Sequence, residues 1–446
     1  MRQNKANNLN SPGYLQIFLF WLPLASTWLM MSVEGPFLTA IIARLPEPKF
    51  NLAAYGVAYS FALIIEAPII MIMSASTALV KDRHSYFKLR NFTYWGNAIL
   101  TLLMLLLCVP VVFDFVMIDL IKLPEDVADL TYWSILLLVP WPGAIGYRRF
   151  FQGILIRFNK TRRVAYGTVI RLTSMGTTAF LMYWSGAFSG VVVGAAALSA
   201  GVLAEALASR WMAADAVRTL LKKKDRTDNE AGELTYRGIF QFYYPLALTS
   251  LLGLGVHPVV TLFVGQSRMA IESLAVLPVI NALVFIFRSL GLSFQEVAIA
   301  LMGERWEGYR KLRNFAGMMA VGVIGMLGVI AITPLAELWY REVSGLTPEL
   351  TRFAILPTRI MILMPALTVV LSFQRSVLVA AKHTQPITWA TITEVAGIVL
   401  ILIVGIVWLD WVGAVAATSA FILGRLGANA YLIRSFYRQV RDFVKI

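Results

Sequence analysis

The sequence is poor in charge and in cysteine. Only 14% of the 446 residues are charged, 58% are hydrophobic, and the mean hydropathy is +0.71. The single cysteine, Cys108, excludes internal disulfides. Apolar runs of twenty or more residues recur from end to end, and each is long enough to cross a hydrocarbon core of about 30 Å. This composition indicates an all-α integral membrane protein, because the ten-residue alternation of a membrane barrel is missing.

Signatures of common enzyme classes are also missing. The sequence contains no GxxxxGK[ST], HExxH or CxxC motif, and only three histidines. These absences predict a chain without ATP hydrolysis, metal site, cofactor or catalytic residues. Tryptophans near the ends of apolar runs are typical of interfacial belts rather than of base-stacking platforms. We therefore expect no nucleic-acid partner.

Twelve apolar segments are separated by polar and Gly/Pro clusters. The predicted spans are 14–43, 52–80, 92–121, 128–156, 164–185, 189–217, 238–265, 270–302, 314–340, 351–381, 385–409 and 412–433. They predict twelve transmembrane helices in two lobes, with residues 1–220 as the N-lobe, 221–236 as an inter-lobe loop and 237–446 as the C-lobe. Prolines inside many of these spans predict kinks.

Basic residues fall mainly on one side of the membrane in this topology. One set of loops and termini holds 25 Lys and Arg, and the other set holds 6. The asymmetry predicts that both termini lie in the cytoplasm and that the protein is a multi-pass protein of the inner (cytoplasmic) membrane. It also accounts for the net charge of +14 without a nucleic-acid partner.

The second half of the sequence repeats the first. IFLFWLPLASTWL (17–29) and IFQFYYPLALTSL (239–251) are identical at eight of thirteen positions, and LVP (138–140) matches LMP (363–365). Because both matched first spans start in the cytoplasm, the two halves are predicted to be parallel, pseudo-symmetric six-helix repeats. Transporters built in this way alternate access by rocking the two halves.

Several short motifs resemble the progressive ankylosis (ANK) family. They are AAYGVAYS (53–60), FYYPLAL (242–248), PTRIMILMP (357–365) and VEGPFLTAIIA (33–43). That family belongs to the multidrug/oligosaccharidyl-lipid/polysaccharide (MOP) superfamily, with the MATE exporters and the lipid-linked sugar flippases. The resemblance implies a MATE-like bundle of two lobes. For the ANK branch it implies export of anions such as pyrophosphate, nucleotides or citrate.

Two charges depart from the animal members of that family. In the animal members, the fifth span carries an acidic residue and the eleventh span a basic one. This sequence, which resembles them, has Arg171 on the fifth span and Glu394 on the eleventh. The exchange suggests an ion pair between the lobes. It also weakens the inference of any substrate from the animal members.

Eight arginines lie within the predicted spans, where a charge costs about 2.5–3.5 kcal/mol at mid-bilayer. Counting from the cytoplasmic ends at about 1.5 Å per residue places four of them about 10–14 Å deep. These four are Arg149, Arg171, Arg375 and Arg425. Guanidinium groups bind phosphate or carboxylate in bidentate fashion. The common depth therefore predicts an inward-facing anion site.

Other charged residues are candidates for the same site or for coupling. Arg148 is turned about 100° from Arg149 on a helix, so we expect one of the two to face substrate and the other to hold a glutamate or a neighbouring helix. The competing interpretation is that each arginine is locked to a glutamate or reaches the interface, as we assign for Arg210. The full set of candidates is Arg148, Arg149, Arg171, Arg288, Arg359, Arg375 and Arg425 for substrate, and Glu34, Glu66, His257, Glu296 and Glu394 for ion coupling or gating.

Three transport functions fit these features, with a non-transporting scaffold as a fourth alternative. The first is a secondary transporter, expected as a monomer, that exports small organic or phosphate-bearing anions with or without coupling to H⁺ or Na⁺. The second is a flippase for a lipid-linked anionic headgroup. The third is a cation-coupled, MATE-like drug exporter, which predicts an acidic, aromatic-lined cavity. The excess of arginine over glutamate at the inner level argues against this third function.

Overall fold

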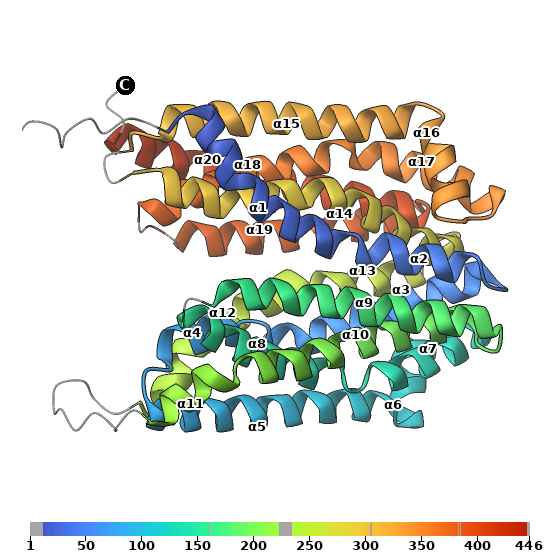
Figure 1. Ribbon diagram of the computed structural model, residues 1–446. Helices are drawn as coiled ribbons and strands as arrows, with labels where there is room; N and C mark the ends of the chain where they lie inside the picture. Colours follow the sequence, from blue (N-terminus) through green and yellow to red (C-terminus); the bar gives the residue numbers. More distant parts are fainter. Residues whose placement is uncertain are drawn as a thin grey trace, which may run out of the picture. The chain divides into compact units, whose positions relative to one another are not determined.

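The computed structural model describes residues 12–158, 160–222, 234–303, 306–381, 383 and 385–443. These residues form helices and contain no strand (Figure 1). Most of the predicted inter-lobe loop 221–236 lies outside the described residues. The twelve predicted spans coincide with helical stretches, which confirms the all-α fold class.

The helices of the N-terminal half run from α1 to α11. Their bounds are α1 Tyr14–Ser32, α2 Glu34–Ala43, α3 Pro48–Glu66, η1 Ala67–Ile69, α4 Ile72–Leu79, α5 Arg83–Leu107, α6 Pro110–Asp114, the π-helical η2 Phe115–Leu120, α7 Glu125–Leu138, α8 Trp141–Arg157, α9 Thr161–Ser185, α10 Gly190–Met212 and α11 Ala214–Lys222. Several breaks fall at prolines, which lack the amide hydrogen that a continuous helix needs.

The C-terminal half repeats this order. Its bounds are α12 Tyr236–Leu254, α13 Val256–Gly265, α14 Ala270–Leu301, α15 Tyr309–Ile332, α16 Leu335–Leu338, the π-helical η3 Trp339–Val343, α17 Pro348–Ile360, η4 Met361–Leu363, α18 Met364–Ala380, α19 Gln385–Leu402, η5 Ile403–Trp408 and α20 Gly413–Phe443. The opening helices α1 and α12 are both 19 residues long, and their successors α2 and α13 are both 10. The internal repeat is therefore present in the helix lengths as well as in the sequence.

Length and hydropathy identify fewer spans than twelve. Among the described residues, eight helical segments are long and apolar enough to cross a membrane, and a ninth is added if α5 and the segment from Pro110 to Leu120, bent by 78°, form one span. The remaining stretches are interrupted by charge or by breaks. Twelve crossings therefore stay a prediction.

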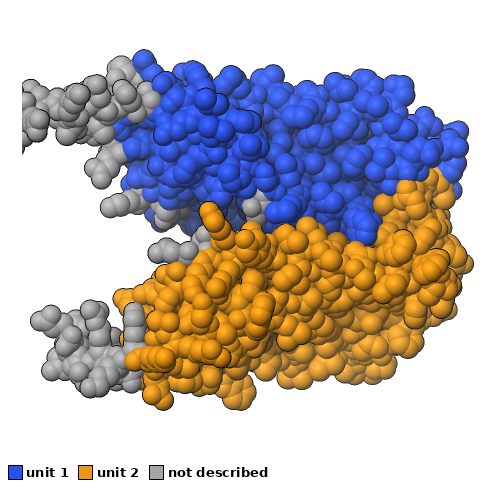
Figure 2. All heavy atoms as spheres, in the orientation of Figure 1, with its two compact units in different colours: residues 1–37, 277–344, 348–446 blue, residues 38–276, 345–347 orange. Residues whose placement is uncertain are grey.

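The chain forms two compact units (Figure 2). Unit 1 comprises residues 1–37, 277–344 and 348–446, and unit 2 comprises residues 38–276 and 345–347. These units do not coincide with the expected division at 1–220 and 237–446. The first span of each half is exchanged, because α1 belongs to unit 1 while α12 and α13 belong to unit 2.

Specific contacts hold each exchanged helix. In unit 1, the indole Nε1 of Trp21 on α1 donates a hydrogen bond of 2.9 Å to Oγ of Ser293 on α14. In unit 2, the Tyr243 hydroxyl on α12 donates to the carbonyl of Pro68. Thr261 on α13 donates to Ser60 on α3 at 3.1 Å. These polar bonds within apolar bundles make each exchanged helix part of the unit that it joins.

Candidate functional site

Buried charges in unit 2 gather on four helices. We call Glu66, Arg148, Arg149, Arg171 and Glu205 the unit 2 charge cluster. Glu66 ends α3, the adjacent arginines lie on α8, Arg171 lies on α9 and Glu205 lies on α10. Four of these residues are less than 9% exposed, and Arg149 is half-buried. Charges this deep persist only with partners or in a polar cavity.

Glu205 is the centre of the unit 2 charge cluster. Its carboxylate forms an ion pair with Arg148, and it accepts a hydrogen bond of 3.0 Å from Gln152 Nε2. Arg171 Nη1 lies 4.0 Å from the same carboxylate. Gln152 follows Arg148 by four residues, so both project from one face of α8. This carboxylate therefore holds three neighbouring side chains.

A buried tryptophan links the second carboxylate of unit 2 to Arg171. Trp141 is 2% exposed, and its Nε1 donates to Glu66 Oε2. The Arg171 guanidinium lies 5.7 Å from a ring centroid of Trp141, within the range of a cation–π contact. Trp141 starts α8 directly after Pro140, so the break between α7 and α8 positions its side chain. The two glutamates are thus joined through Trp141 and Arg171.

The adjacent arginines of α8 have different surroundings. Arg148 is held by Glu205, which meets the expectation that one of the two arginines holds a glutamate. Arg149 has no carboxylate within ion-pair distance among the described residues. Its Nη1 lies 3.6 Å from Met73 Sδ, and a thioether is a weak acceptor. A substrate-facing role for Arg149 remains a prediction.

Unit 1 carries a second cluster, which contains a smaller proportion of acidic residues. We call Arg288, Arg375, Arg425 and Glu394 the unit 1 charge cluster. Arg425 binds Glu394 through Nε at 2.8 Å and Nη2 at 2.7 Å. The charges of Arg425 and Glu394 also act on Arg288 and Arg375. Three arginines therefore share a single described carboxylate.

Neutral groups complete the contacts of this cluster. Arg425 Nη1 donates to Thr368 Oγ1 at 3.2 Å, and Arg375 Nη2 donates to Thr391 Oγ1 at 3.3 Å. Asn429, one turn beyond Arg425, donates to the carbonyl of Leu367 at 3.2 Å. These bonds join α18, α19 and α20, which also share an apolar core. The helix framework thus fixes Arg425 more firmly than Arg375.

Four guanidinium groups have a buried Nε donor without a hydrogen-bond partner among the described residues, and they belong to Arg148, Arg149, Arg288 and Arg375. Arg148 is already paired with Glu205 through Nη1. The other three arginines make no ion pair within the described residues. Buried donors without acceptors are costly, and oxygen atoms of a phosphate or carboxylate would satisfy them. Both charge clusters therefore contain donors that the oxygen atoms of an anion would satisfy.

The other predicted site residues lie outside the two clusters. Arg359 is exposed, and its Nε donates to the carbonyl of Ala331 at 3.2 Å. Glu296 is also exposed on α14. Glu34 is buried at the start of α2, and His257 is half-buried near the start of α13. The alternative pair Glu66–Arg359 is not needed, because each residue has a partner within its own unit.

Arg210, which is expected either to be locked to a partner or to reach the interface, is exposed near the end of α10, and its guanidinium lies over the ring of Phe151. The expected ion pair between Arg171 and Glu394 stays a prediction. Each of these residues has an oppositely charged neighbour in its own unit, Glu205 for Arg171 and Arg425 for Glu394.

Sequence reasoning missed Trp141, Gln152 and Thr368 as contributors to the clusters. Gln152 could have been found from its four-residue spacing to Arg148. The partner of Glu205 could not, because Arg148 is 57 residues away in sequence and the pairing depends on how α8 and α10 pack.

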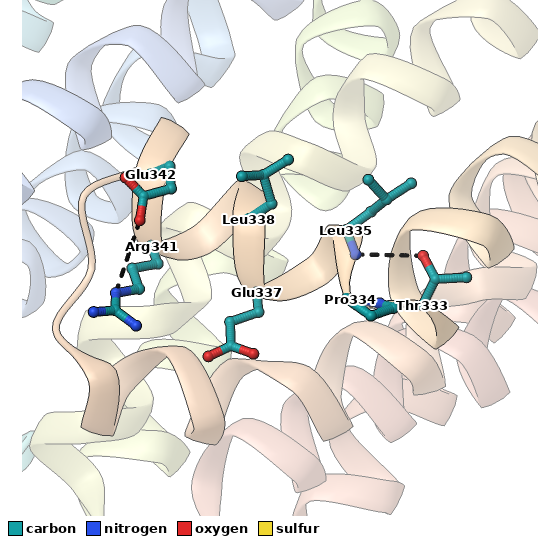
Figure 3. Close-up of a pocket in the computed structure, with 7 residues that line it drawn as sticks. All are labelled: Thr333, Pro334, Leu335, Glu337, Leu338, Arg341 and Glu342. Carbon is teal, nitrogen blue, oxygen red and sulfur yellow. Dashed lines mark hydrogen bonds and ion pairs between the residues drawn. The ribbon is translucent and has the colours of Figure 1, made fainter.

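Each unit also has a hollow that is lined by residues outside its charge cluster. A hollow of about 570 Å³ in unit 1 is lined by residues that follow α15 (Figure 3), including Glu337, Arg341 and Glu342. A hollow of about 260 Å³ in unit 2 lies near Lys122 and Glu272. The described residues contain no group of His, Cys, Asp and Glu that could hold a metal ion.

Solved structures with the same fold are transporters of the MOP superfamily. The lipid II flippase MurJ in an inward closed conformation has a TM-score of 0.70 at 14% identity, covering 95% of this chain and 89% of that chain. An inward-facing MATE family multidrug resistance transporter has a TM-score of 0.66 at 12% identity, covering 95% and 98%. A MOP superfamily transporter from Pyrococcus furiosus, described as having a binding pocket of reverse polarity that suggests a different function, has a TM-score of 0.56 at 15% identity, covering 96% and 93%.

These identities are too low to show more than the fold. No protein-family model and no curated protein matches the sequence. The MATE-like fold implied by the sequence motifs is therefore confirmed, whereas membership of the ANK family stays a prediction.

Proposed function

We propose that this protein is a secondary transporter of the ANK branch of the MOP superfamily that exports small organic or phosphate-bearing anions. The supporting observation is that each charge cluster contains half-buried arginines whose Nε atoms are buried without an acceptor and which have no ion-pair partner among the described residues. Arginine keeps its charge when it is dehydrated, and its planar fork matches carboxylate and phosphate oxygens. Such groups suit a small polyanion that sheds water as it enters the protein.

The roles of the arginines differ in this proposal. Arg149, Arg288 and Arg375 contact the substrate, because they combine an unmet Nε donor with the lack of an ion-pair partner among the described residues. Arg148 and Arg425 are positioning residues, since Glu205 and Glu394 hold them. The glutamates limit the net positive charge of each cluster when no anion is bound. Alternating access with or without a coupled cation, a monomeric state and residence in the inner membrane with both termini cytoplasmic belong to the same proposal.

The experiment is uptake into inside-out membrane vesicles that contain the full chain. Labelled pyrophosphate, a nucleotide and citrate are supplied outside, and initial rates are compared for wild type, Arg149→Gln and Arg375→Gln. Removing one charge-assisted contact costs about 1.5–3 kcal/mol, so each variant should lose at least about tenfold in rate at limiting substrate. The control is Arg218→Gln, which removes an exposed charge from α11 and should transport like wild type. Unchanged transport of every polyanion in both variants would refute the proposal.

A second candidate is a flippase for a lipid-linked anionic headgroup. Its support is the similarity to MurJ, which at 0.70 has a higher TM-score than the MATE transporter at 0.66. The same arginines would bind the headgroup phosphate. Translocation of a fluorescent lipid-linked diphosphate in proteoliposomes, without uptake of soluble anions, would favour this candidate. The cation-coupled drug exporter fits less well, because arginines outnumber glutamates in both clusters.

A further inference from the structure

A second group of arginines lies on the outer surface of unit 2, apart from the buried cluster. Arg90 on α5 has its guanidinium carbon 4.7 Å from the ring centroid of Phe87, 5.7 Å from that of Tyr94 and 6.0 Å from that of Tyr86. Arg210 on α10 lies 5.2 Å from the ring centroid of Phe151 on α8. The Tyr86 ring centroid lies 5.7 Å from that of Phe150, which lies 5.2 Å from that of Phe151, so a row of packed aromatic rings on α5 and α8 links the two guanidinium groups.

This arginine pair has no acidic partner within the described part of the chain. Arg90 donates from Nε and Nη2 to the amide oxygen of Asn91, at 3.3 and 3.0 Å. The acid nearest in sequence, Asp82, accepts from Ser85 in the capping box that starts α5. Stacking on aromatic rings fixes the direction of each guanidinium but leaves its positive charge uncompensated. The pair therefore lacks an anion.

An exposed apolar surface continues from this pair along α5. Arg90, Tyr94, Ala98 and Leu102 follow one another at four-residue intervals, so they lie in one row on the helix. Ala98 is exposed, Leu102 is 65% exposed, and Trp95 beside the row is 73% exposed. On α10, exposed Leu207 precedes Arg210 by one turn. Figure 1 shows α5 along an edge of its bundle, with α11 beside its first turns.

We propose that Arg90 and Arg210 bind the headgroup phosphate of an anionic phospholipid, whose acyl chain lies along the exposed row of α5. The order along the helix, from charge through tyrosine and tryptophan to leucine, matches the order of headgroup, interface and hydrocarbon in a leaflet. Arginine forks bind phosphate oxygens in bidentate fashion. A soluble phosphate would use the same arginines but would gain nothing from the apolar row. This site is independent of the proposed transport activity.

The test is native mass spectrometry of the full chain titrated with phosphatidylglycerol or phosphatidylcholine. Wild type should retain phosphatidylglycerol preferentially, and Arg90→Gln with Arg210→Gln should lower its apparent affinity by about tenfold or more, since each arginine near an anionic headgroup is worth about 1 kcal/mol. The matched control is Arg218→Gln with Arg237→Gln, which removes two exposed charges without aromatic contacts and should change affinity by less than about threefold. Glycerol 3-phosphate, a headgroup without acyl chains, should not displace the lipid.

Three outcomes would overturn the proposal. They are equal losses in the glutamine pair and the control pair, displacement of the lipid by glycerol 3-phosphate, and an equal preference of wild type for the two lipids. Each variant is first checked for monodisperse elution and for the wild-type melting temperature. The lysine pair Arg90→Lys with Arg210→Lys adds a fourth readout. It should fall between wild type and the glutamine pair, because it keeps the charge but loses the planar fork.

Discussion

The two units place opposite charges at matching positions of the repeat. In unit 2, Arg171 on α9 lies where α10 crosses at Gly201, and in unit 1, Glu394 on α19 lies where α20 crosses at Gly424. The charged residue precedes the glycine by the same interval in both halves, 171 to 201 and 394 to 424. The repeat therefore preserves the helix crossing while it reverses the sign of the charge. The two halves thus share the position of the helix crossing but differ in the sign of the charge beside it.

Arg171 and Glu394 have neighbours of opposite charge, and these neighbours differ between the two units. Arg171 faces a carboxylate, Glu205, that also holds Arg148 and Gln152. Glu394 faces Arg425 in a pair supported by Thr368. Unit 2 thus has two carboxylates for three arginines, and unit 1 has one. We infer that unit 2 holds its arginines more rigidly, whereas unit 1 leaves more positive charge for a ligand.

Removing the central carboxylate of unit 2 should have the largest effect on stability. Glu205→Gln leaves Arg148 buried without its ion-pair partner, which costs about 3–5 kcal/mol. Glu394→Gln should cost less, about 1–3 kcal/mol, because Arg425 keeps the Thr368 hydroxyl. Thermal unfolding of the purified full chain in detergent measures both. The exposed Glu349→Gln serves as the control. Equal losses for Glu205→Gln and Glu394→Gln would contradict the comparison.

Adding a methyl group at the two helix crossings should have a smaller effect. A Cβ at Gly424 would lie 2.6 Å from Ile398 Cγ1 and 2.8 Å from the backbone oxygen of Glu394. A Cβ at Gly201 would meet Met175 Cβ at 3.0 Å and the Arg171 oxygen at 3.1 Å. Overpacking of this kind costs about 1–3 kcal/mol.

Gly424→Ala should therefore lower the melting temperature more than Gly201→Ala does. The exposed Gly13→Ala, where nothing lies within 4 Å, is the control. A reversed order for Gly424→Ala and Gly201→Ala would mean that α19 and α20 cross less tightly than α9 and α10.

The smallest effect is expected at an ion pair outside the bundle. Asp215 on α11 binds Lys160 and Arg163, and the hydrogen bond from Lys160, followed by that from Arg163, lowers the Asp215 pKa from 3.8 to about 2. Because the folded-state pKa is lowered, the stabilisation is present above about pH 3.8 and is lost as the pH falls through 2. The site is exposed, so its contribution is at most about 1 kcal/mol.

Asp215→Asn should therefore reduce stability slightly at pH 6, and the reduction should shrink as the pH falls toward and below 2. Unfolding of wild type and variant across this pH range measures the difference. A difference that grows on acidification would show that Asp215 is not held as its two basic partners suggest.

Much of the fold could be predicted from the sequence, because apolar runs and loop chemistry are local signals. The breaks near Pro68, Pro140 and Pro365 lie at residues whose chemistry interrupts helices. The exchange of α1 and α12 between units could not be predicted. It depends on contacts such as Trp21 with Ser293, which are far apart in the sequence.

The candidate site was predicted only in part, for a similar reason. The depth of Arg149 and Arg375 could be counted along one helix. Depth alone does not reveal partners, so the sequence could not distinguish Arg148, which binds Glu205, from Arg149, which lies near a thioether. Arg359 and Glu296 are candidates because they lie within predicted spans, but the side chains of both are exposed.

Equilibrium binding of pyrophosphate to the purified full chain tests the central claim most directly. Isothermal titration calorimetry compares wild type with Arg375→Gln and with Arg218→Gln as the control. The account predicts that Arg375→Gln weakens binding by about tenfold or more, since one charge-assisted contact to an otherwise unmet donor is lost, while the control binds like wild type. Equal affinities for wild type and Arg375→Gln, with folding intact, would contradict the assignment of the unit 1 charge cluster as an anion site.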